Sequence, residues 1–167
     1  MGPSLPLSRV VALVGGVALV GAYFMPWFAS QGLLLSGQFL NDFLAAASPA
    51  DLQRFVPGTG PTEARLLRIL VDLFPSCGVV AAVVCLLITL WANVVVLDVL
   101  LALSGLLPLV AWAVGVGRLP QGSTAQVGLW LIAVGSLAIL LGATLEFAAR
   151  RGNPGHASTV SDTQSYQ

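Results

Sequence analysis

Long hydrophobic runs, separated by shorter polar stretches, dominate the sequence. A helix needs about 20 consecutive apolar residues to cross the roughly 30 Å hydrocarbon core of a bilayer. The apolar runs predict membrane-crossing helices at about 10–28, 74–92, 99–117 and 127–149. We therefore expect an all-α membrane protein, with a four-transmembrane-helix bundle over residues 1–150.

The two middle spans come from one uninterrupted apolar stretch, residues 74–116. As a single helix this stretch would be about 65 Å long, twice the thickness of the hydrocarbon core. It must therefore fold back on itself. The strongly polar residues within it, Asn93 and Asp98, place the turn near 91–98.

The first apolar run follows Arg9 and has the outline of a signal peptide. A cleavage site requires small residues, and Trp27 and Phe28 stand where those residues would be needed. We therefore expect the run to remain as an uncleaved first span.

The segment between the first and second spans is amphipathic. In this cap, residues 36–73, helical periodicity predicts short helices over 38–47 and 62–73, with Ser36 as a cap of the first. Ser48 to Asp51 has the form of a capping box. These helices are too short and too polar to span, so we expect them at the membrane surface. The polar residues 151–167 predict a disordered tail.

Composition agrees with a membrane environment. Hydrophobic residues make up 57% of the chain and charged residues only 8%, whereas a soluble domain has about 25% charged residues. The formal net charge is zero, which gives no long-range attraction to a nucleic acid. The expected partners are the lipid bilayer and other membrane proteins, or further copies of the chain.

Source and sidedness follow from the basic residues. The chain has no lysine, and its arginines accompany abundant Ala, Gly and Pro, which indicates GC-rich coding and a bacterial plasma membrane. Four spans place both termini on one side, with Arg9, Arg150 and Arg151. The other side carries four arginines, but Arg54 lies far from any span and counts least. We favour both termini in the cytoplasm.

Small residues recur at helical spacing in two spans, and such stripes let helices approach closely within a membrane. Packing inside the bundle is the favoured interpretation, and contact with another protein is the alternative. The candidate packing residues are Gly78, Ala82, Cys85 and Thr89 in the second span and Ala138 and Gly142 in the fourth.

Few polar residues lie in or near the spans. Asp98 either caps the third span or lies on a proton or ion pathway with Asn93, and capping is favoured. Glu146 precedes Arg150 by four residues, which predicts an interfacial ion pair. Tryptophan favours membrane interfaces. The interfacial candidates are Trp27, Trp91 and Trp130.

Sequence motifs for catalysis are missing. The single histidine, His156, lies in the tail, so no span offers an axial haem ligand. There is no Cys-x-x-Cys and no phosphate-binding Gly-Lys motif. We expect no catalytic, metal or cofactor-binding residues, no cofactor, and a protein that is not an enzyme.

Three residue pairs carry a resemblance: Pro26-Trp27 at the end of the first span, Ser36-Gly37 after it, and Phe74-Pro75 at the start of the second. In these the chain resembles small uncharacterised bacterial four-span membrane proteins. Its span order and loop lengths are also similar to those of claudin-like tetraspan proteins. The claudin Trp-Gly-Leu-Trp stretch is absent from residues 30–73, so the resemblance implies no claudin function.

Together these features predict a non-catalytic integral membrane subunit or scaffold that packs against partner membrane proteins. The alternative is a small channel or transporter, in oligomeric form, with Asp98 near the pathway.

Overall fold

The structure is a computed structural model that describes residues 6–30, 32–48, 50–51, 61–90, 95–117 and 123–151. Among these described residues, four helices are long and apolar enough to cross a membrane. They are α1 (Leu7–Phe24), α4 (Pro61–Leu90), α5 (Val95–Val116) and α6 (Val127–Arg151). The predicted all-α fold with four long apolar helices is therefore confirmed.

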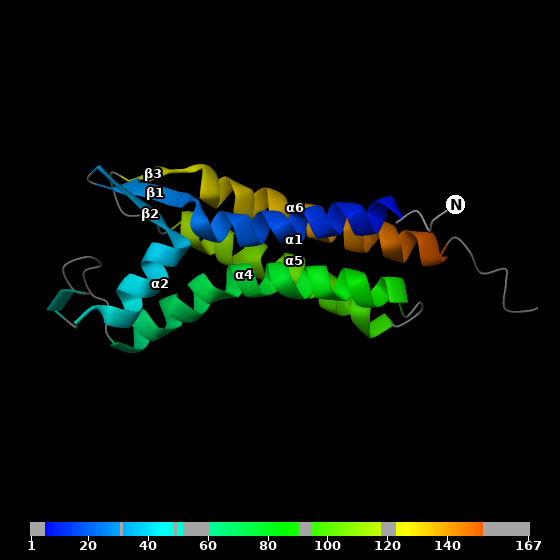
Figure 1. The fold of residues 1–167 in the computed structure, drawn as a ribbon, viewed down its shortest axis with the longest axis horizontal. Helices are drawn as coiled ribbons and strands as arrows, with labels where there is room; N and C mark the ends of the chain where they lie inside the picture. The colour runs from blue at the N-terminus through cyan, green and yellow to red at the C-terminus, as the bar shows by residue number, and fades with distance from the viewer. Residues whose placement is uncertain are drawn as a thin grey trace, which may run out of the picture.

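The four helices form an antiparallel ring. Helix α1 packs against α4 and α6, and α5 packs against the same two helices from the opposite side. Figure 1 shows the start of α1 and the end of α6 at the same end of the bundle. We call this the terminal end. The opposite end, which holds helix α2 and the strands, is the cap end.

The first span is shorter than predicted. Helix α1 ends at Phe24, whereas the apolar pattern predicts a span to residue 28. Pro26 causes the difference, because the residue before a proline is driven into extended backbone. Met25 accordingly has φ −84° and ψ 153°. The aromatic residues that follow belong to strand β1 (Pro26–Ser30).

The second span is longer than predicted. One continuous helix, α4, replaces the predicted surface helix over 62–73 and the separate span over 74–92. Pro75 lies inside α4 and removes one backbone hydrogen bond, which bends a helix without necessarily ending it. Figure 1 shows α4 bending along its length. At about 45 Å, α4 exceeds the hydrocarbon thickness, so its first turns project beyond the other long helices at the cap end.

A three-stranded sheet lies at the cap end, and the sequence pattern does not predict this sheet. Strand β1 pairs antiparallel with β2 (Leu33–Ser36) on one side and with β3 (Thr124–Ala125) on the other. Gly32, in the turn between β1 and β2, has φ +80°, a conformation that glycine adopts readily. The sheet thereby ties the chain after α1 to the segment before α6.

Helix α2 (Gly37–Ala46) corresponds to the short helix predicted over 38–47, with bounds shifted by one residue. The Ser36 hydroxyl oxygen accepts a hydrogen bond from the Phe39 amide at 3.2 Å. The capping box is also present, because the Asp51 amide donates to the Ser48 hydroxyl at 3.3 Å and Ser48 donates back to the Asp51 carboxylate.

Trp27 is the centre of the cap end. It is 5% exposed, its indole N–H donates to the Ala22 carbonyl at 2.7 Å, and its ring meets Phe74 edge-on at 5.1 Å. A side chain at Gly37 would lie 2.5 Å from this indole, and one at Gly128 would lie 2.8 Å from it. Trp27 therefore holds the starts of α2 and α6 against α4 and α1.

Helix α1 approaches α6 and α4 through two pairs of glycines. A Cβ atom added at Gly15 would lie 2.5 Å from the Gly135 carbonyl of α6, and one at Gly135 would lie 2.9 Å from the Gly15 carbonyl. Gly16 and Gly78 make the same reciprocal contact between α1 and α4, at 2.8 and 2.6 Å. Adjacent glycines on α1 therefore set its spacing to two neighbours at once.

The contact predicts opposite effects of the same substitution at two positions of α1. Gly15→Ala lowers the free energy of unfolding by about 1–3 kcal/mol, because the added methyl group overpacks the α1–α6 crossing. Gly21→Ala is the matched control, since no atom lies within 4 Å of the added Cβ. It raises stability by about 0.5–1 kcal/mol through helix propensity. Thermal unfolding in detergent measures both, and equal effects would contradict the packing.

Candidate functional site

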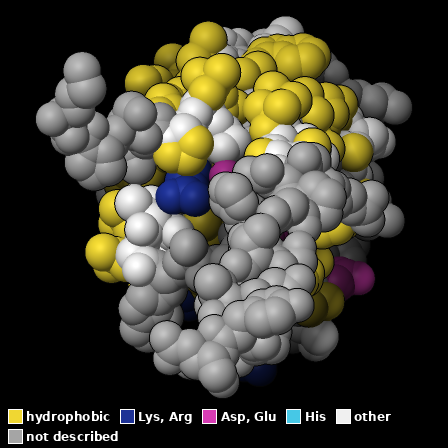
Figure 2. Space-filling view, turned by 90° about the vertical axis from the view of Figure 1, so that its right-hand side faces the viewer, with side chains coloured by type: hydrophobic (Ala, Val, Ile, Leu, Met, Phe, Trp, Pro, Cys, Tyr) yellow, Lys and Arg dark blue, Asp and Glu magenta, His cyan; other side chains and the backbone are white. Residues whose placement is uncertain are grey.

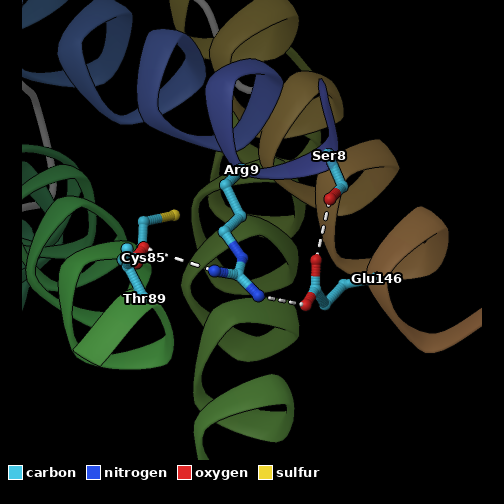
Figure 3. A network of polar contacts seen from close by, with 5 residues as sticks. All are labelled: Ser8, Arg9, Cys85, Thr89 and Glu146. Carbon is cyan, nitrogen blue, oxygen red and sulfur yellow. Dashed lines mark hydrogen bonds and ion pairs between the residues drawn. The ribbon is translucent and has the colours of Figure 1, made fainter. Parts of the chain in front are cut away.

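Polar side chains from three helices meet at the terminal end of the bundle. Figure 3 shows Arg9 reaching from α1 toward Glu146 of α6 and Thr89 of α4. Arg9 Nη2 lies 3.0 Å from Glu146 Oε1, and the Ser8 hydroxyl donates to Glu146 Oε2 at 2.7 Å. Arg9 Nη1 makes a long contact, 3.5 Å, with Thr89 Oγ1. The Thr89 hydroxyl donates to the Cys85 carbonyl at 2.8 Å.

Local structure explains why Glu146 belongs at the first turn of α1. The residue before α1 is Pro6, which provides no side-chain cap. A carboxylate is favoured near a helix N-terminus and disfavoured near a C-terminus. Because α6 runs antiparallel to α1, Glu146 in its last turns lies beside the positive end of α1. Gly142 permits this approach, since a Cβ there would lie 2.6 Å from the Ser8 carbonyl.

The ion pair is largely removed from solvent. The Arg9 side chain is 20% exposed and that of Glu146 is 10% exposed. Figure 2, a view onto the terminal end, shows a basic side chain beside an acidic one, with hydrophobic side chains around them. Removing one member of a buried pair leaves an uncompensated charge and is strongly destabilising. The pair therefore ties α1 to α6 at the end opposite Trp27.

Asp98 brings the fourth helix to the same end. It lies in the first turn of α5, within the helix and not at the N-cap position that the sequence favours, and it is 6% exposed. It lines a groove of about 400 Å³ between α5 and α6, opposite Thr144 and Phe147. We call the set Arg9, Thr89, Asp98 and Glu146, one residue from each long helix, the polar layer.

Most of the predicted packing residues are buried or half-buried, and two of them contact α1 directly. On α4, Gly78 meets α1, Cys85 is buried, and Ala82 is half-buried beside Gly16. On α6, Gly142 meets the first turns of α1 and Ala138 is half-buried. Gly15 and Gly135 also pack between helices and are not among the predicted packing residues. Gly135 precedes Gly142 by one heptad, and this spacing is the signal that could have found it.

The predicted interfacial tryptophans differ in their exposure. Trp27 is enclosed by protein, whereas Trp130 is 56% exposed and its ring centroid lies 5.9 Å from that of Trp112. Trp91 and Asn93 lie outside the described residues. The predicted partner of Glu146 was Arg150, whose side chain is not described. The observed partners Arg9 and Ser8 are more than 130 residues away in sequence.

The described interactions of the polar layer are hydrogen bonds and an ion pair that hold helices together. The Thr89 hydroxyl donates to the Cys85 carbonyl, the neighbouring Ser8 hydroxyl donates to the Glu146 carboxylate, and that carboxylate pairs with the Arg9 guanidinium. Among the described residues, no three His, Cys, Asp or Glu side chains gather as a metal site would require. Both thiols, Cys77 and Cys85, are free and buried in α4.

Comparison with models of known protein families, with curated proteins and with solved structures found no match to the chain. Function must therefore be argued from the bundle and its polar layer.

The Arg9–Glu146 contact predicts strong coupling between two helices. Arg9→Met and Glu146→Leu each lower the free energy of unfolding by about 2–4 kcal/mol, because each removes one member of a largely buried ion pair. The double variant loses less than the sum, with a coupling energy of about 1–3 kcal/mol.

Unfolding of the single and double variants in detergent measures the coupling. Arg65→Met replaces an exposed arginine on α4 and serves as the control, with an unchanged unfolding midpoint. Strict additivity of the two single effects would show that Arg9 and Glu146 do not act as a pair.

Proposed function

We propose that the chain crosses a lipid bilayer four times. The support is the outer surface of the bundle, where large hydrophobic side chains stay exposed on every long helix. Examples are Val14 on α1 at 60%, Leu86 on α4 at 61% and Leu137 on α6 at 54%. Monomers in water rarely expose apolar patches of more than a few hundred Å², and hydrocarbon is the environment that suits such a surface.

The chain would lie in a bacterial plasma membrane with both termini in the cytoplasm. The terminal end would then carry Arg9, Arg150 and Arg151 on the cytoplasmic side, where basic residues are favoured. The cap end, with the sheet, α2 and the projecting start of α4, would form the outer surface.

Within that membrane, the protein would act as a non-catalytic subunit or scaffold that packs against partner membrane proteins. One observation carries this proposal: the polar layer joins helices to one another. Ser8, Arg9 and Thr89 have their described contacts with Glu146 or with helix α4. Such an arrangement fixes the shape of the bundle and leaves its outer faces for contact.

Helix α5 offers the largest free face. In its apolar membrane-length segment only 22% is buried inside the protein, against 28% for α1, 39% for α4 and 50% for α6. Gly105 on its inner side packs against α6, where a Cβ would lie 3.0 Å from the Ser136 carbonyl. The outer side of α5, which carries Val96, Leu103 and Leu107, is exposed. We assign the partner contact to this outer face.

The packing favours the scaffold over the small channel. Leu101, Ile132 and Ile139 are fully buried and fill the interior. The hydroxyl groups of Ser104 and Thr89, which would line a pathway with Asp98, donate instead to carbonyls of their own helices at 2.7 and 2.8 Å.

A native purification tests the scaffold proposal. We expect the protein, extracted from its own membranes in mild detergent, to run as a complex larger than one 17.2 kDa chain. Replacing Leu103 and Leu107 with Ala, which trims the outer face of α5, should reduce that complex. The matched control, Val14→Ala and Val17→Ala, trims the exposed face of α1 and should leave it intact. A wild-type protein that always runs as a monomer would refute the proposal.

Cysteine labelling tests the crossings and their direction. Asp42→Cys, at an exposed position of α2, should react with a membrane-impermeant maleimide in intact cells. Ser161→Cys should react only after the membrane is opened. The native thiols are buried and provide a low background. Equal labelling of both variants in intact cells would contradict four crossings, and the reverse pattern would contradict cytoplasmic termini.

A further inference from the structure

Helix α2 and the start of α4 form one unit at the cap end. Figure 1 shows the two helices side by side, leaving the line of the bundle together. The Arg68 side chain of α4 donates from Nε to Asn41 Oδ1 of α2 at 3.0 Å, and Ala64 and Val71 of α4 are buried. We call α2 together with residues 61–74 of α4 the arm.

The turn of α4 where the arm joins the bundle is weakened in two ways. Pro75 has no N–H, so the Val71 carbonyl lacks its helical donor. At the next residue, the Ser76 hydroxyl donates to the Asp72 carbonyl at 2.7 Å. A serine that bonds to the carbonyl four residues earlier often bends a helix. Pro75 and Ser76 therefore make this turn the place where α4 bends most readily.

Both helices of the arm meet the bundle at one buried side chain, Trp27. The Phe74 ring, next to the weakened turn, lies edge-on to the indole at 5.1 Å. Gly37, the first residue of α2, is so close that an added Cβ would lie 2.5 Å from the same ring. Motion about this point moves the far end of the arm most, since Ala46 lies about 13 Å along α2 from Gly37. Trp27 is thus placed as a pivot.

A hydrogen bond joins the arm to α1 about one helical turn from the pivot. Asn41 Nδ2 donates to the Tyr23 hydroxyl at 3.1 Å, while Asn41 Oδ1 accepts from Arg68. One side chain therefore links the two helices of the arm and also connects them to α1. The bond to Tyr23 is only partly buried, and the net contribution of a neutral hydrogen bond to stability is small. Breaking it costs little free energy.

We propose that the arm pivots about Trp27 through the bend at Pro75 and Ser76, and that the hydrogen bond from Asn41 to Tyr23 holds it in the position seen in the structure. When that bond opens, the arm swings and the ring of four long helices keeps its shape. The cap end then has two arrangements, which present the exposed Leu66 and Ile69 of the arm differently. This inference goes beyond the scaffold role and does not depend on the partner contact assigned to α5.

Distances between spin labels test the motion in the purified protein in detergent. Double electron–electron resonance between cysteines at Ala46, at the exposed end of α2, and Thr124, in strand β3, measures the position of the arm. A second pair, Val14 on α1 and Val110 on α5, reports on the ring and serves as the control. The native thiols are buried and provide a low background.

Tyr23→Phe removes the acceptor of the hydrogen bond and keeps the ring. The ratio of displaced to held arm, measured by the Ala46–Thr124 pair, should rise about two- to tenfold, the effect expected from loss of one neutral hydrogen bond. The Val14–Val110 distance should stay the same. Tyr166→Phe, which removes the other tyrosine hydroxyl of the chain, is the matched control and should change neither distance.

Pro75→Ala tests the bend independently. Restoring the N–H gives the Val71 carbonyl its donor, so the Ala46–Thr124 distribution should become narrower than in the wild-type protein. An Ala46–Thr124 distribution that is the same in the wild-type protein and in Tyr23→Phe would overturn the proposal, as would one that Pro75→Ala leaves equally broad. A Val14–Val110 distance that changes together with the arm in Tyr23→Phe would also overturn it, because the whole bundle would then have loosened.

The outcomes separate this inference from the proposed function. A protein that forms a complex in native membranes but shows a fixed arm would refute only the pivot. A protein that stays monomeric, yet releases its arm in Tyr23→Phe, would retain the pivot and refute the scaffold.

Discussion

The close approach of α1 to two helices is the constraint on which the rest of the structure depends. Gly15 and Gly16 are neighbours in sequence, yet one meets Gly135 of α6 and the other meets Gly78 of α4. In the proposed lipid environment, apolar burial would give no drive for helix association, and van der Waals contact between small residues would be one of the interactions that replace it. Helix α1 therefore fixes the spacing of half the ring, and α5 completes it from the other side.

Different interactions hold the two ends of this arrangement. At the cap end, Trp27 fills the space between α2, α4 and α6, and the pairs Pro26-Trp27, Ser36-Gly37 and Phe74-Pro75 converge there in contact with or next to its ring. At the terminal end, the Arg9–Glu146 pair joins α1 to α6. Glycine contacts set the distance between helices, whereas these two ends oppose sliding and rotation. The described polar groups at both ends therefore hold the helices of the bundle in place.

Features determined by nearby residues could be predicted from the sequence, and features formed between distant segments could not. Apolar run lengths gave the four helices, and short-range capping patterns gave Ser36 and the Ser48–Asp51 box. Strand β1 pairs with Thr124 and Ala125, almost 100 residues away, which periodicity cannot indicate. Likewise helical spacing indicates only nearby partners for Glu146, such as Arg150, whereas its observed partner Arg9 lies 137 residues away. Phe74-Pro75 predicts the start of a helix, but α4 continues through Pro75, with Phe74 packed on the distant Trp27.

The central claim, a membrane bundle that packs against a partner through α5, is tested most directly by photo-crosslinking in living cells. A photoreactive amino acid at Leu103 would face outward from α5, and one at Leu137 would face outward from α6. We expect a discrete adduct between Leu103 and another membrane-embedded polypeptide, or a second copy of this chain, and lipid adducts from Leu137. Lipid adducts alone from Leu103 would contradict it.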